Sequence, residues 1–556
     1  MALGGAQANL PPFPRLLQGL EPGSLILFLG GSVTEQNLYT LYFELYVRSR
    51  WQDKRFRFVN VGWAEHRVAD ALGRLQRDVL ARRPALALLG FGLNDGQYRA
   101  ADRGLLAGWR RDLDTLTARL RESGSAVVVM SPTPVDPDLA PPLGRIRYND
   151  SLEQLGAVAA EVAAARSCYF ADVFHPLLRV QDMAKSLQPS FSCIPDGVHP
   201  DPVGHLVIAY HLLSALDLVV PAANATVDAA AGQTLHAEGC RMTDVLADAH
   251  GLRAVLWADA PPFPLPPEAA GADALVPWQR ELGFNHVAVV GLAEGHYGVY
   301  AGADRLGGYE AAELRHGVAI GVRDAVRTRW EAALAVARER FADHLFAWRR
   351  FDPGVEGSVG QGSPEIMEAY RALGAVQEEA LRSLLRPVPL PLEVVPEVEL
   401  HFERFEVVGP YPLEGRDGYT ASFPPERDED APWAETAAHN PETGFLDFVR
   451  LFGAVPQAVA YARCRLHVPH EAELRLRLGS DDGWKLLVNG HPVAGRDIYR
   501  GAAPGQDGVA VPLQAGWNTL LLRVNNGAGA WQLYCAGSVT GVHGPAAQEV
   551  RLACRT

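Results

Sequence analysis

The chain has 556 residues, a formal net charge of −14, 48% hydrophobic residues and 21% charged residues. Because domains usually span about 100–200 residues, this length predicts three or four folded units rather than one core. The acidic balance, without a basic stripe to offset it, disfavours a phosphate backbone, so we expect no nucleic-acid partner. No apolar run approaches the ~18 residues that a membrane span needs, so we expect no membrane partner.

Residues 1–9 contain neither a basic segment nor a continuous apolar run, so no secretory signal is visible. The sequence therefore predicts a cytoplasmic protein, or an extracellular one whose leader has been removed. The six cysteines lack C-x-x-C or zinc-finger spacing, which argues against a zinc site and against a disulfide framework. We expect reduced cysteines, no metal and no cofactor. The sequence leaves the oligomeric state open.

Short apolar runs alternate with amphipathic stretches from Ser24 to about Leu218. This alternation is typical of parallel strands joined by helices. The predicted strands are 24–29, 56–61, 85–91, 126–130 and 168–173. Between them, apolar residues share one helical face at Leu38, Leu41, Tyr42 and Leu45, and again at Leu105, Trp109, Leu113, Leu116 and Leu120. The pattern predicts an α/β fold with a doubly wound parallel sheet of the flavodoxin-like kind.

The composition changes after Pro221, where short β-type runs at 253–258, 286–292 and 297–301 predict a small β-rich unit. Apolar residues then recur at steps of three and four, from Val326 to Trp348 and from Ile366 to Leu384, on either side of a Gly-rich break at 354–362. We expect these two stretches to form an antiparallel helical hairpin.

The Pro-rich stretch 387–396 is typical of a semi-rigid linker, and the residue pattern after it is that of β-strands throughout. Residues 484–488 run into Asn489-Gly490, and 517–524 run into Asn525-Asn526-Gly527, which both predict hairpins. We expect three domains: an α/β domain at 1–219, a β-rich unit with the helical hairpin and linker at 220–395, and a jelly-roll-like β-sandwich at 396–556. In the sandwich, tryptophans at 433, 484, 517 and 531 either stack on sugars or belong to its core.

The first predicted strand ends in Gly30-Gly31-Ser32, which places Ser32 at the carboxyl edge of the sheet, where ligand sites of open α/β sheets concentrate. Ser32 is a candidate nucleophile. The alternative is a capping box, because Ser32-x-x-Glu35 is also the pattern that satisfies the first-turn amides of a helix.

Two further polar blocks follow predicted strands. Asn94, in Gly92-Leu93-Asn94-Asp95, can donate a hydrogen bond to a developing oxyanion, although an Asx turn explains it equally well. In Pro195-Asp196-Gly197-Val198-His199, the aspartate can orient the imidazole so that its other nitrogen faces a serine. The alternative there is a turn with an exposed histidine.

Together, Gly-Gly-Ser-Val-Thr, Gly-Leu-Asn-Asp and Asp-Gly-Val-His resemble the blocks of the SGNH (GDSL-like) hydrolase superfamily, over Ser24 to about Leu218. The chain does not resemble an α/β-hydrolase, because Thr34 stands where the second glycine of Gly-x-Ser-x-Gly would be. The resemblance implies that Ser32 is the nucleophile, His199 the general base and then acid, and Asp196 the residue that orients it.

The resemblance further implies an oxyanion hole built from the Ser32 amide, the Asn94 side chain and the amide of Glu65. The sequence departs from the family at that last position, since Ala64 and Glu65 stand where two glycines are usual. Glu65 still supplies an amide if its backbone adopts an ordinary conformation, but a nearby carboxylate opposes a developing oxyanion unless it points away, pairs with Arg67 or is protonated.

Trp63, Asp95 and Tyr98 flank these blocks and are the candidate substrate-binding residues. The sequence thus predicts a metal-independent serine esterase that removes a short acyl group, most simply acetyl, from a small-molecule or glycan ester. The rival hypotheses are a lipase or thioesterase on the same fold, and a glycan-binding protein that lost its oxyanion hole at Glu65.

Overall fold

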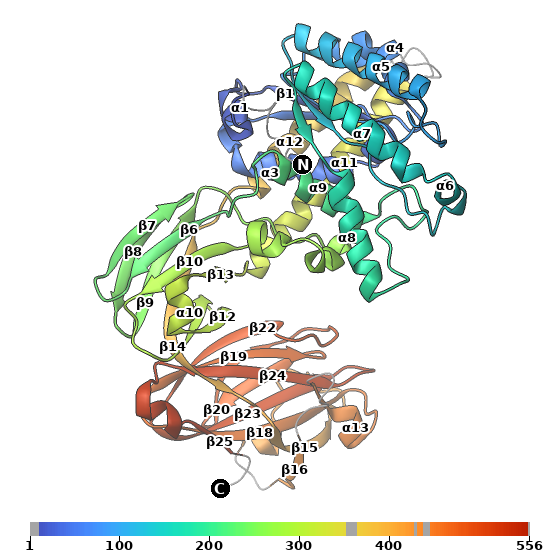
Figure 1. The fold of residues 1–556 in the computed structure, drawn as a ribbon. Coiled ribbons are helices and arrows are strands. Elements are labelled where there is room, and N and C mark those ends of the chain that lie inside the picture. The colour runs from blue at the N-terminus through green and yellow to red at the C-terminus, as the bar shows by residue number, and fades with distance from the viewer. Residues whose placement is uncertain (1–9, 352–363, 428–430, 438–444, 554–556) are drawn as a thin grey trace.

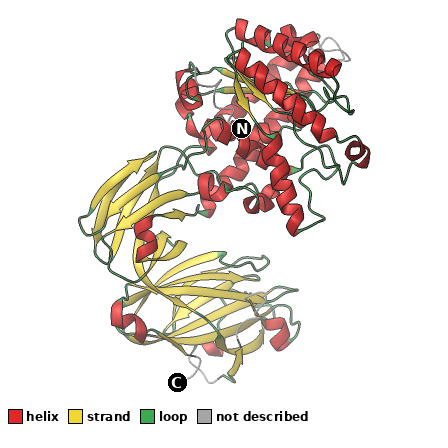
Figure 2. Ribbon diagram, in the orientation of Figure 1, coloured by secondary structure: helices red, strands yellow, loops and turns green. Residues whose placement is uncertain are grey.

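The computed structural model describes residues 10–351, 364–427, 431–437 and 445–553 of the chain. Most of its helices gather at one end of the molecule around a parallel sheet, and two β-rich parts, which contain α10 (Ala311–His316) and α13 (Phe448–Phe452), follow (Figures 1 and 2). The N-terminal stretch 1–9, where a secretory signal was sought, and the Gly-rich break at 354–362 lie outside the described residues. No helix within the described ranges is both long and apolar enough to cross a bilayer.

Five parallel strands form the sheet of the α/β part, in the order β2-β1-β3-β4-β5. Residues 26 and 28 of the first strand are buried in one core, and residues 27 and 29 in the core on the other face. A strand covered on both sides reads as a continuous apolar run, which is why the sequence located these strands well. The flavodoxin-like doubly wound sheet is confirmed. The strands are β1 (Leu25–Gly30), β2 (Arg57–Asn60), β3 (Leu86–Gly90), β4 (Ala126–Met130) and β5 (Tyr169–Ala171).

Helices cover both faces of this sheet. The core on one face includes residues of α3 and α9, and the core on the other face includes residues of α4 and α5. The helices of this segment are α1 (Phe13–Gly19), α2 (Ser32–Glu35), α3 (Leu38–Arg50), α4 (Val68–Asp78), α5 (Arg103–Glu122), α6 (Pro141–Arg145), α7 (Tyr148–Ala165), α8 (Phe174–Leu187) and α9 (Pro202–Ala215).

The two long helices expected within 220–395 are present as α11 (Asp324–Phe351) and α12 (Pro364–Leu384), and they pack against each other. They lie with the α/β part rather than beside the β-sheets (Figure 1). Trp330 and Leu334 of α11 and Leu381 of α12 belong to one core of the parallel sheet, and Trp348 belongs to the other. Residues far beyond 219 therefore complete the core of the α/β part.

The middle β-part contains a four-stranded sheet in the order β13-β10-β6-β7, together with strands of a nine-stranded sheet. Both contribute to a shared core. Its elements are β6 (Asn224–Asp228), β7 (Gln233–Glu238), β8 (Cys240–Asp248), β9 (Gly251–Ala258), β10 (Asn285–Val290), β11 (His296–Ala301), β12 (Asp304–Glu310), α10 (Ala311–His316) and β13 (Val318–Ile320).

The expectation of a linker at 387–396 is wrong, because most of this stretch belongs to β14 (Leu390–Leu400). The first half of β14 pairs with β9 and β11, and its second half pairs with β24 of the sandwich. Leu390, Leu392 and Val394 are buried at alternate positions, and this period-two pattern prevails over the prolines. A proline has no backbone N–H to donate to a neighbouring strand. Its carbonyl can still accept, and the Pro396 carbonyl accepts a hydrogen bond from the Gly541 amide at 3.1 Å. The nine-stranded sheet thus runs from the middle part into the sandwich.

The C-terminal part is a β-sandwich, as expected, with one core between two antiparallel sheets. The Asn489-Gly490 hairpin is confirmed, since both residues have positive φ (51° and 80°) between two paired strands. The hairpin at Asn525-Asn526-Gly527 is wrong: both asparagines stay in β23, whose partners belong to one sheet, while β24 pairs within the other. The elements are β15 (Arg404–Pro412), β16 (Ala434–Ala437), β17 (Phe445–Asp447), α13 (Phe448–Phe452), β18 (Ala458–Val468), β19 (Ala472–Ser480), β20 (Trp484–Val488), β21 (His491–Arg496), β22 (Asp507–Leu513), β23 (Gly516–Asn526), β24 (Gln532–Thr540) and β25 (Arg551–Ala553).

Candidate active site

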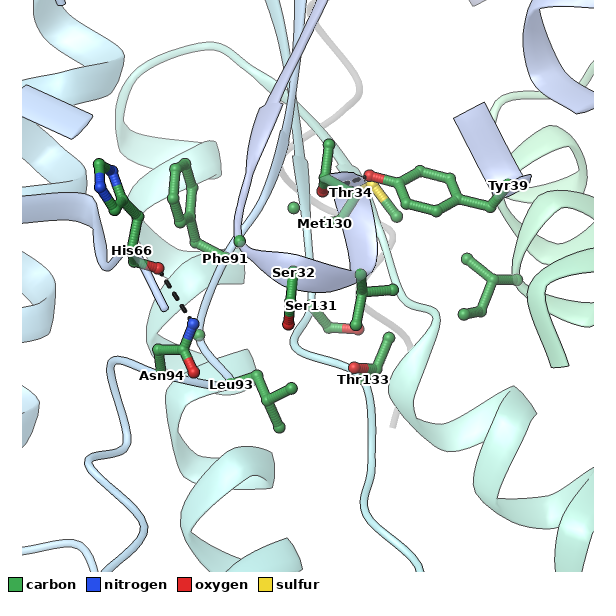
Figure 3. A pocket seen from close by; sticks show the side chains of 15 residues that line it. Ser32, Thr34, Tyr39, His66, Phe91, Leu93, Asn94, Met130, Ser131 and Thr133 are labelled. Carbon is green, nitrogen blue, oxygen red and sulfur yellow. Dashed lines mark hydrogen bonds between the residues drawn. The ribbon is translucent and has the colours of Figure 1, made fainter. Parts of the chain in front are cut away.

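The three polar blocks meet at the carboxyl edge of the parallel sheet. Ser32 begins α2 directly after β1, Asn94 follows β3, and Asp196 and His199 lie on the loop that precedes α9. Figure 3 shows the Ser32 side chain directed into a pocket between Leu93 and Thr133, with Asn94 at its side. Segments distant in sequence thus converge because parallel strands end at a common edge.

Ser32, His199 and Asp196 form a continuous hydrogen-bonded chain. His199 Nε2 lies 3.0 Å from Ser32 Oγ, and His199 Nδ1 lies 2.8 Å from Asp196 Oδ2. The other carboxylate oxygen of Asp196 accepts the amides of Val198 and His199 at 2.8 and 2.6 Å. Partial burial acts to raise the pKa of Asp196, but the hydrogen bonds from His199 and Val198 outweigh it and hold that pKa below its ordinary value. The carboxylate is therefore ionised and fixed against the imidazole.

The capping-box alternative for Ser32 is wrong. Gly31 is the N-cap of α2, and no side chain caps this helix. The Glu35 carboxylate instead accepts a hydrogen bond from the Ala64 amide and pairs with Arg349 of α11. The serine hydroxyl is thereby left to His199.

The Asn94 side chain is held from both ends. Its Nδ2 donates to the His66 carbonyl at 3.2 Å, and its Oδ1 accepts the Tyr98 hydroxyl at 2.8 Å, as Figure 3 shows in part. A Cβ atom on Gly31 would lie 3.1 Å from Asn94 Nδ2, so the amide stands directly beside the residue that precedes Ser32. These two hydrogen bonds, from Nδ2 and to Oδ1, fix the orientation of the Asn94 amide group.

Glu65 has a φ of 65°, in the left-handed region that favours glycine. Glu65 therefore adopts the left-handed conformation open to glycine and not the ordinary one, so its N–H is oriented as that of a glycine in the same conformation would be. Pairing with Arg67 is also not observed, because the Arg67 guanidinium lies 3.6 Å from Asp70 instead. The Glu65 side chain is exposed at the rim of the site.

The three candidate substrate-binding residues lie in different settings. Tyr98 is 42% exposed and stacks on Tyr148; burial raises its pKa, and the nearby carboxylates of Glu65 and Asp196 raise it further. Trp63 is covered by an arginine of α11, whose guanidinium lies 4.3 Å from the ring centroid. Asp95 is buried.

Both carboxylate oxygens of Asp95 are used within the fold. They accept the amides of Val68 at 2.9 Å and Gly92 at 3.0 Å, which ties the exit of β3 to the start of α4. Burial raises the pKa of Asp95 to about 6, against these hydrogen bonds, which lower it. In this geometry Asp95 positions the backbone of the site, and of the three candidates only Tyr98 offers an exposed polar group beside Asn94.

The cavity beside Ser32 is small, with a volume of about 30 Å³. Val33, Leu93, Met130 and Ile208 give it apolar walls, and no Asp, Glu, Lys or Arg is among the described residues that line it. Such a space suits a short uncharged group attached to the carbonyl that Ser32 faces. Within the described part of the chain, no group of three or more His, Cys, Asp and Glu side chains is placed to hold a metal ion.

Several residues that support the site were not found from the sequence. His205 lies fully buried behind it, accepting the Tyr39 amide at 3.3 Å and contacting Gln36 Oε1 at 2.9 Å. Glu35 stands only three residues from Ser32, but its partner Arg349 follows 314 residues later (349 − 35). Only the packing of α11 against the α/β part, which no local pattern reveals, brings that arginine here.

The parallel-sheet part of the chain is similar to known proteins. Residues 28–207 match the GDSL-like Lipase/Acylhydrolase family. An acetylxylan esterase of Geobacillus stearothermophilus is 23% identical over 209 residues, which span 34% of this chain and 91% of that protein. A gut microbial diltiazem-metabolizing enzyme shares the fold with a TM-score of 0.58 and 20% identity, over 68% of this chain and 98% of that one. Residues 28–207 therefore form a GDSL-like lipase/acylhydrolase domain of the SGNH superfamily, and the chain that carries it is a carboxylic ester hydrolase.

Proposed function

We propose that the chain is a serine esterase that removes short acyl groups, acetyl above all, from carbohydrate esters, with Ser32 as nucleophile. The observation that carries this proposal is the chain of contacts from Ser32 Oγ to His199 Nε2 (3.0 Å) and from His199 Nδ1 to Asp196 (2.8 Å). A hydroxyl, an imidazole and an ionised carboxylate in this order form the machinery for acyl transfer.

In the proposed reaction, Ser32 Oγ attacks the acyl carbon while His199 takes the hydroxyl proton and passes it to the departing sugar oxygen. A water molecule then attacks the acyl-enzyme, gives its proton to His199, and releases the acid as Ser32 regains a proton. Asp196 holds the imidazole in the productive tautomer throughout. The oxyanion lies between the Ser32 amide, the Asn94 side chain and the Glu65 amide.

The preference for a short, neutral acyl group rests on the pocket and on charge. Apolar side chains and neutral polar ones, among them Ser131 and Thr133, line the small cavity beside Ser32. Asp196 and Glu65 both raise the pKa of Tyr98, so two carboxylates stand close to the entrance and repel an anionic acyl chain. The carbohydrate part of the proposal is supported by the similarity to an acetylxylan esterase.

The C-terminal sandwich contributes less to this proposal than its tryptophans suggest. Trp484 and Trp531 are 3% and 0% exposed and belong to the core, whereas Trp517 is 47% exposed. Of these three, Trp517 alone has an exposed ring, and the Arg465 guanidinium lies 5.3 Å from its centroid.

The test is hydrolysis of p-nitrophenyl acetate, butyrate and octanoate, and of acetylated xylo-oligosaccharides, by the wild type and by Ser32→Ala. We expect the acetate to be the best of the three synthetic esters, and Ser32→Ala to lose several orders of magnitude in kcat while its melting temperature is kept. A fluorophosphonate should label Ser32, and a metal chelator should leave turnover unchanged.

Two outcomes would favour the rivals. Faster turnover of the octanoate than of the acetate would indicate a lipase or thioesterase. A wild type without turnover on any ester, yet retarded on a polysaccharide column, would indicate the glycan-binding protein. Full activity in Ser32→Ala would overturn the assignment of the nucleophile.

A further inference from the structure

The last turn of α11 reaches the edge of the active site. Arg349 pairs with Glu35, one turn after Ser32 in α2, and donates to the Gly62 carbonyl at 3.3 Å. Its guanidinium also lies over the Trp63 ring, 4.3 Å from the centroid. One side chain from beyond the 28–207 domain thus contacts α2 and two residues of the 62–66 loop.

The same loop carries Glu65 in its left-handed conformation. A residue with a side chain is strained in this conformation, which persists only when the surroundings enforce it. Glu35 completes the enforcement, because its second carboxylate oxygen accepts the amide of Ala64, the residue just before Glu65. The Arg349–Glu35 pair therefore contacts all three residues that precede the strained one, namely Gly62, Trp63 and Ala64.

We propose that Arg349 is a positioning residue for ester hydrolysis: it holds the 62–66 loop so that the Glu65 amide faces the acyl oxygen in the transition state. This inference rests on the proposed function. It gives α11 a role in the reaction, since the helix adds a contact from outside the 28–207 domain to a loop that the domain also holds, for example through the Trp63 amide, which donates to the Gly30 carbonyl at 3.0 Å.

The pair is suited to this role by its burial. The side chains of Glu35 and Arg349 are 19% and 29% exposed, so their attraction is screened less than that of a surface pair. The flat guanidinium can bond to the carboxylate and stack on the indole at once, which a lysine cannot reproduce. Trp348, the residue before Arg349, also packs against the Trp63 ring, in an edge-to-face arrangement.

The experiment compares Arg349→Ala with Arg349→Lys and Glu35→Gln. Arg350→Ala is the matched control, because it removes the same charge from an exposed neighbour on the same helix. Losing a well-placed oxyanion donor costs ~10²–10³ in kcat, so we expect Arg349→Ala to lower kcat about 10- to 100-fold with KM nearly unchanged. Arg349→Lys should lose less, and Arg350→Ala should match the wild type.

Four readouts separate positioning from mere stabilisation. Labelling of Ser32 by a fluorophosphonate should slow by a factor similar to kcat, because that reaction also builds negative charge on the oxygen. Amides 62–66 should exchange hydrogen faster in Arg349→Ala. Guanidinium ion should restore part of the activity of Arg349→Ala and none of that of Ser32→Ala. The double variant Arg349→Ala/Glu35→Gln should be hardly worse than either single variant.

The inference fails if Arg349→Ala melts at a lower temperature but keeps the wild-type kcat and labelling rate. It also fails if KM rises while kcat is unchanged, since the residue would then act in substrate binding. If Arg349→Ala does not fold, kcat, KM and the labelling rate of Arg349→Lys and Glu35→Gln are compared with those of the wild type instead. Full activity in Ser32→Ala would instead overturn the proposed function, so the two failures are distinguishable.

Discussion

Gly62 lies so close to Glu35 that a Cβ atom on Gly62 would come within 2.6 Å of the Glu35 amide nitrogen. The 62–66 loop therefore rests directly on the backbone of α2, and its glycine is required by close approach rather than by backbone conformation. The position of the loop relative to Ser32 depends on this contact.

We expect Gly62→Ala to lower kcat about 10- to 100-fold, because the methyl group must push the loop away from α2 and displace the Glu65 amide. Turnover of p-nitrophenyl acetate measures the effect. Gly73→Ala is the control, since nothing lies within 4 Å of a Cβ added there and the site is in α4. That variant should keep its activity and melt at the same or a slightly higher temperature. Equal activity in both variants would show that the loop has room to adjust.

Asp196→Asn should lower kcat by about 10²–10⁴. An amide in place of the carboxylate can donate to His199 Nδ1, which favours the tautomer that cannot take the proton of Ser32. The carboxylate side chain is 57% exposed, so water replaces part of what is lost and the lower end of the range is expected.

The matched control for Asp196 is a second Asp-x-x-His pair. His175 Nδ1 lies 2.7 Å from Asp172 Oδ2, but its Nε2 faces Glu153 at 3.0 Å rather than a serine. His175→Ala should therefore leave kcat at the wild-type level. A comparable loss in His175→Ala would mean that the assay reports on folding, and an unchanged kcat in Asp196→Asn would remove Asp196 from the mechanism.

The two Asp-x-x-His pairs show what the sequence could predict. The Asp-x-x-His spacing is the same in 195–200 and in 172–175, and only the resemblance of 195–200 to a family block distinguishes the two in the sequence. The strands and the convergence of three blocks were predictable, since parallel strands that are buried on both faces produce apolar runs and end at one edge.

Features that depend on distant packing were not predictable. Nothing near Arg349 indicates that it meets Glu35, because the contact follows from docking α11 on the α/β part. The Pro-rich stretch was read as a linker since prolines disfavour a strand, while the alternation of Leu390, Leu392 and Val394 was the signal that mattered. The position of Asp95 after a strand suggests substrate binding, but both of its carboxylate oxygens accept hydrogen bonds from backbone amides, those of Val68 and Gly92.

Acid should destabilise the α/β part through buried histidines. Burial lowers the pKa of His205 to about 3, of His211 to about 4 and of His344 to about 3. In the unfolded chain these groups titrate near pH ~6.5. Between that pH and their folded pKa values the unfolded chain binds more protons, so stability is full above about pH 6.5 and is lost as pH falls, by up to about 1.4 kcal/mol per pH unit for each histidine.

Urea unfolding at pH 7.5, 6.5 and 5.5 measures this loss. His205→Gln should be less stable than the wild type at pH 7.5 but should lose less on acidification, because glutamine does not titrate. His236→Gln is the control, since that histidine is 53% exposed on β7. The explanation is refuted if His205→Gln and the wild type lose stability with the same slope.

Glu65→Gly should raise kcat, by up to about 10- to 100-fold, because it relieves the left-handed strain and removes a carboxylate beside the oxyanion. Glu65→Gln separates the two causes, since it discards the charge and keeps the strain. A gain in both variants assigns the effect to charge, and a gain in Gly alone assigns it to the backbone. An unchanged kcat with a raised KM in both would mean that the Glu65 side chain binds substrate.

Glu397 should hold the middle β-part and the sandwich together. Its side chain is fully buried in β14, pairs with Arg305 of β12 and accepts the Tyr300 hydroxyl of β11 at 2.5 Å. Removing one partner of a buried ion pair leaves an uncompensated charge, so Glu397→Ala should lower the free energy of unfolding by about 3–5 kcal/mol. Because β14 belongs to the sheet of both parts, we expect them to unfold together, in one transition by calorimetry.

Glu399→Ala is the matched control for this prediction, because the same residue type is removed two positions further along β14, where the side chain is exposed. Its unfolding should differ from the wild type by less than about 0.5 kcal/mol. Protease cleavage near 387–396 should not release a folded sandwich, since it cuts a strand that both parts share. A sandwich that survives this cleavage, or that melts at its wild-type temperature in Glu397→Ala, would mean that the nine-stranded sheet does not act as one cooperative unit.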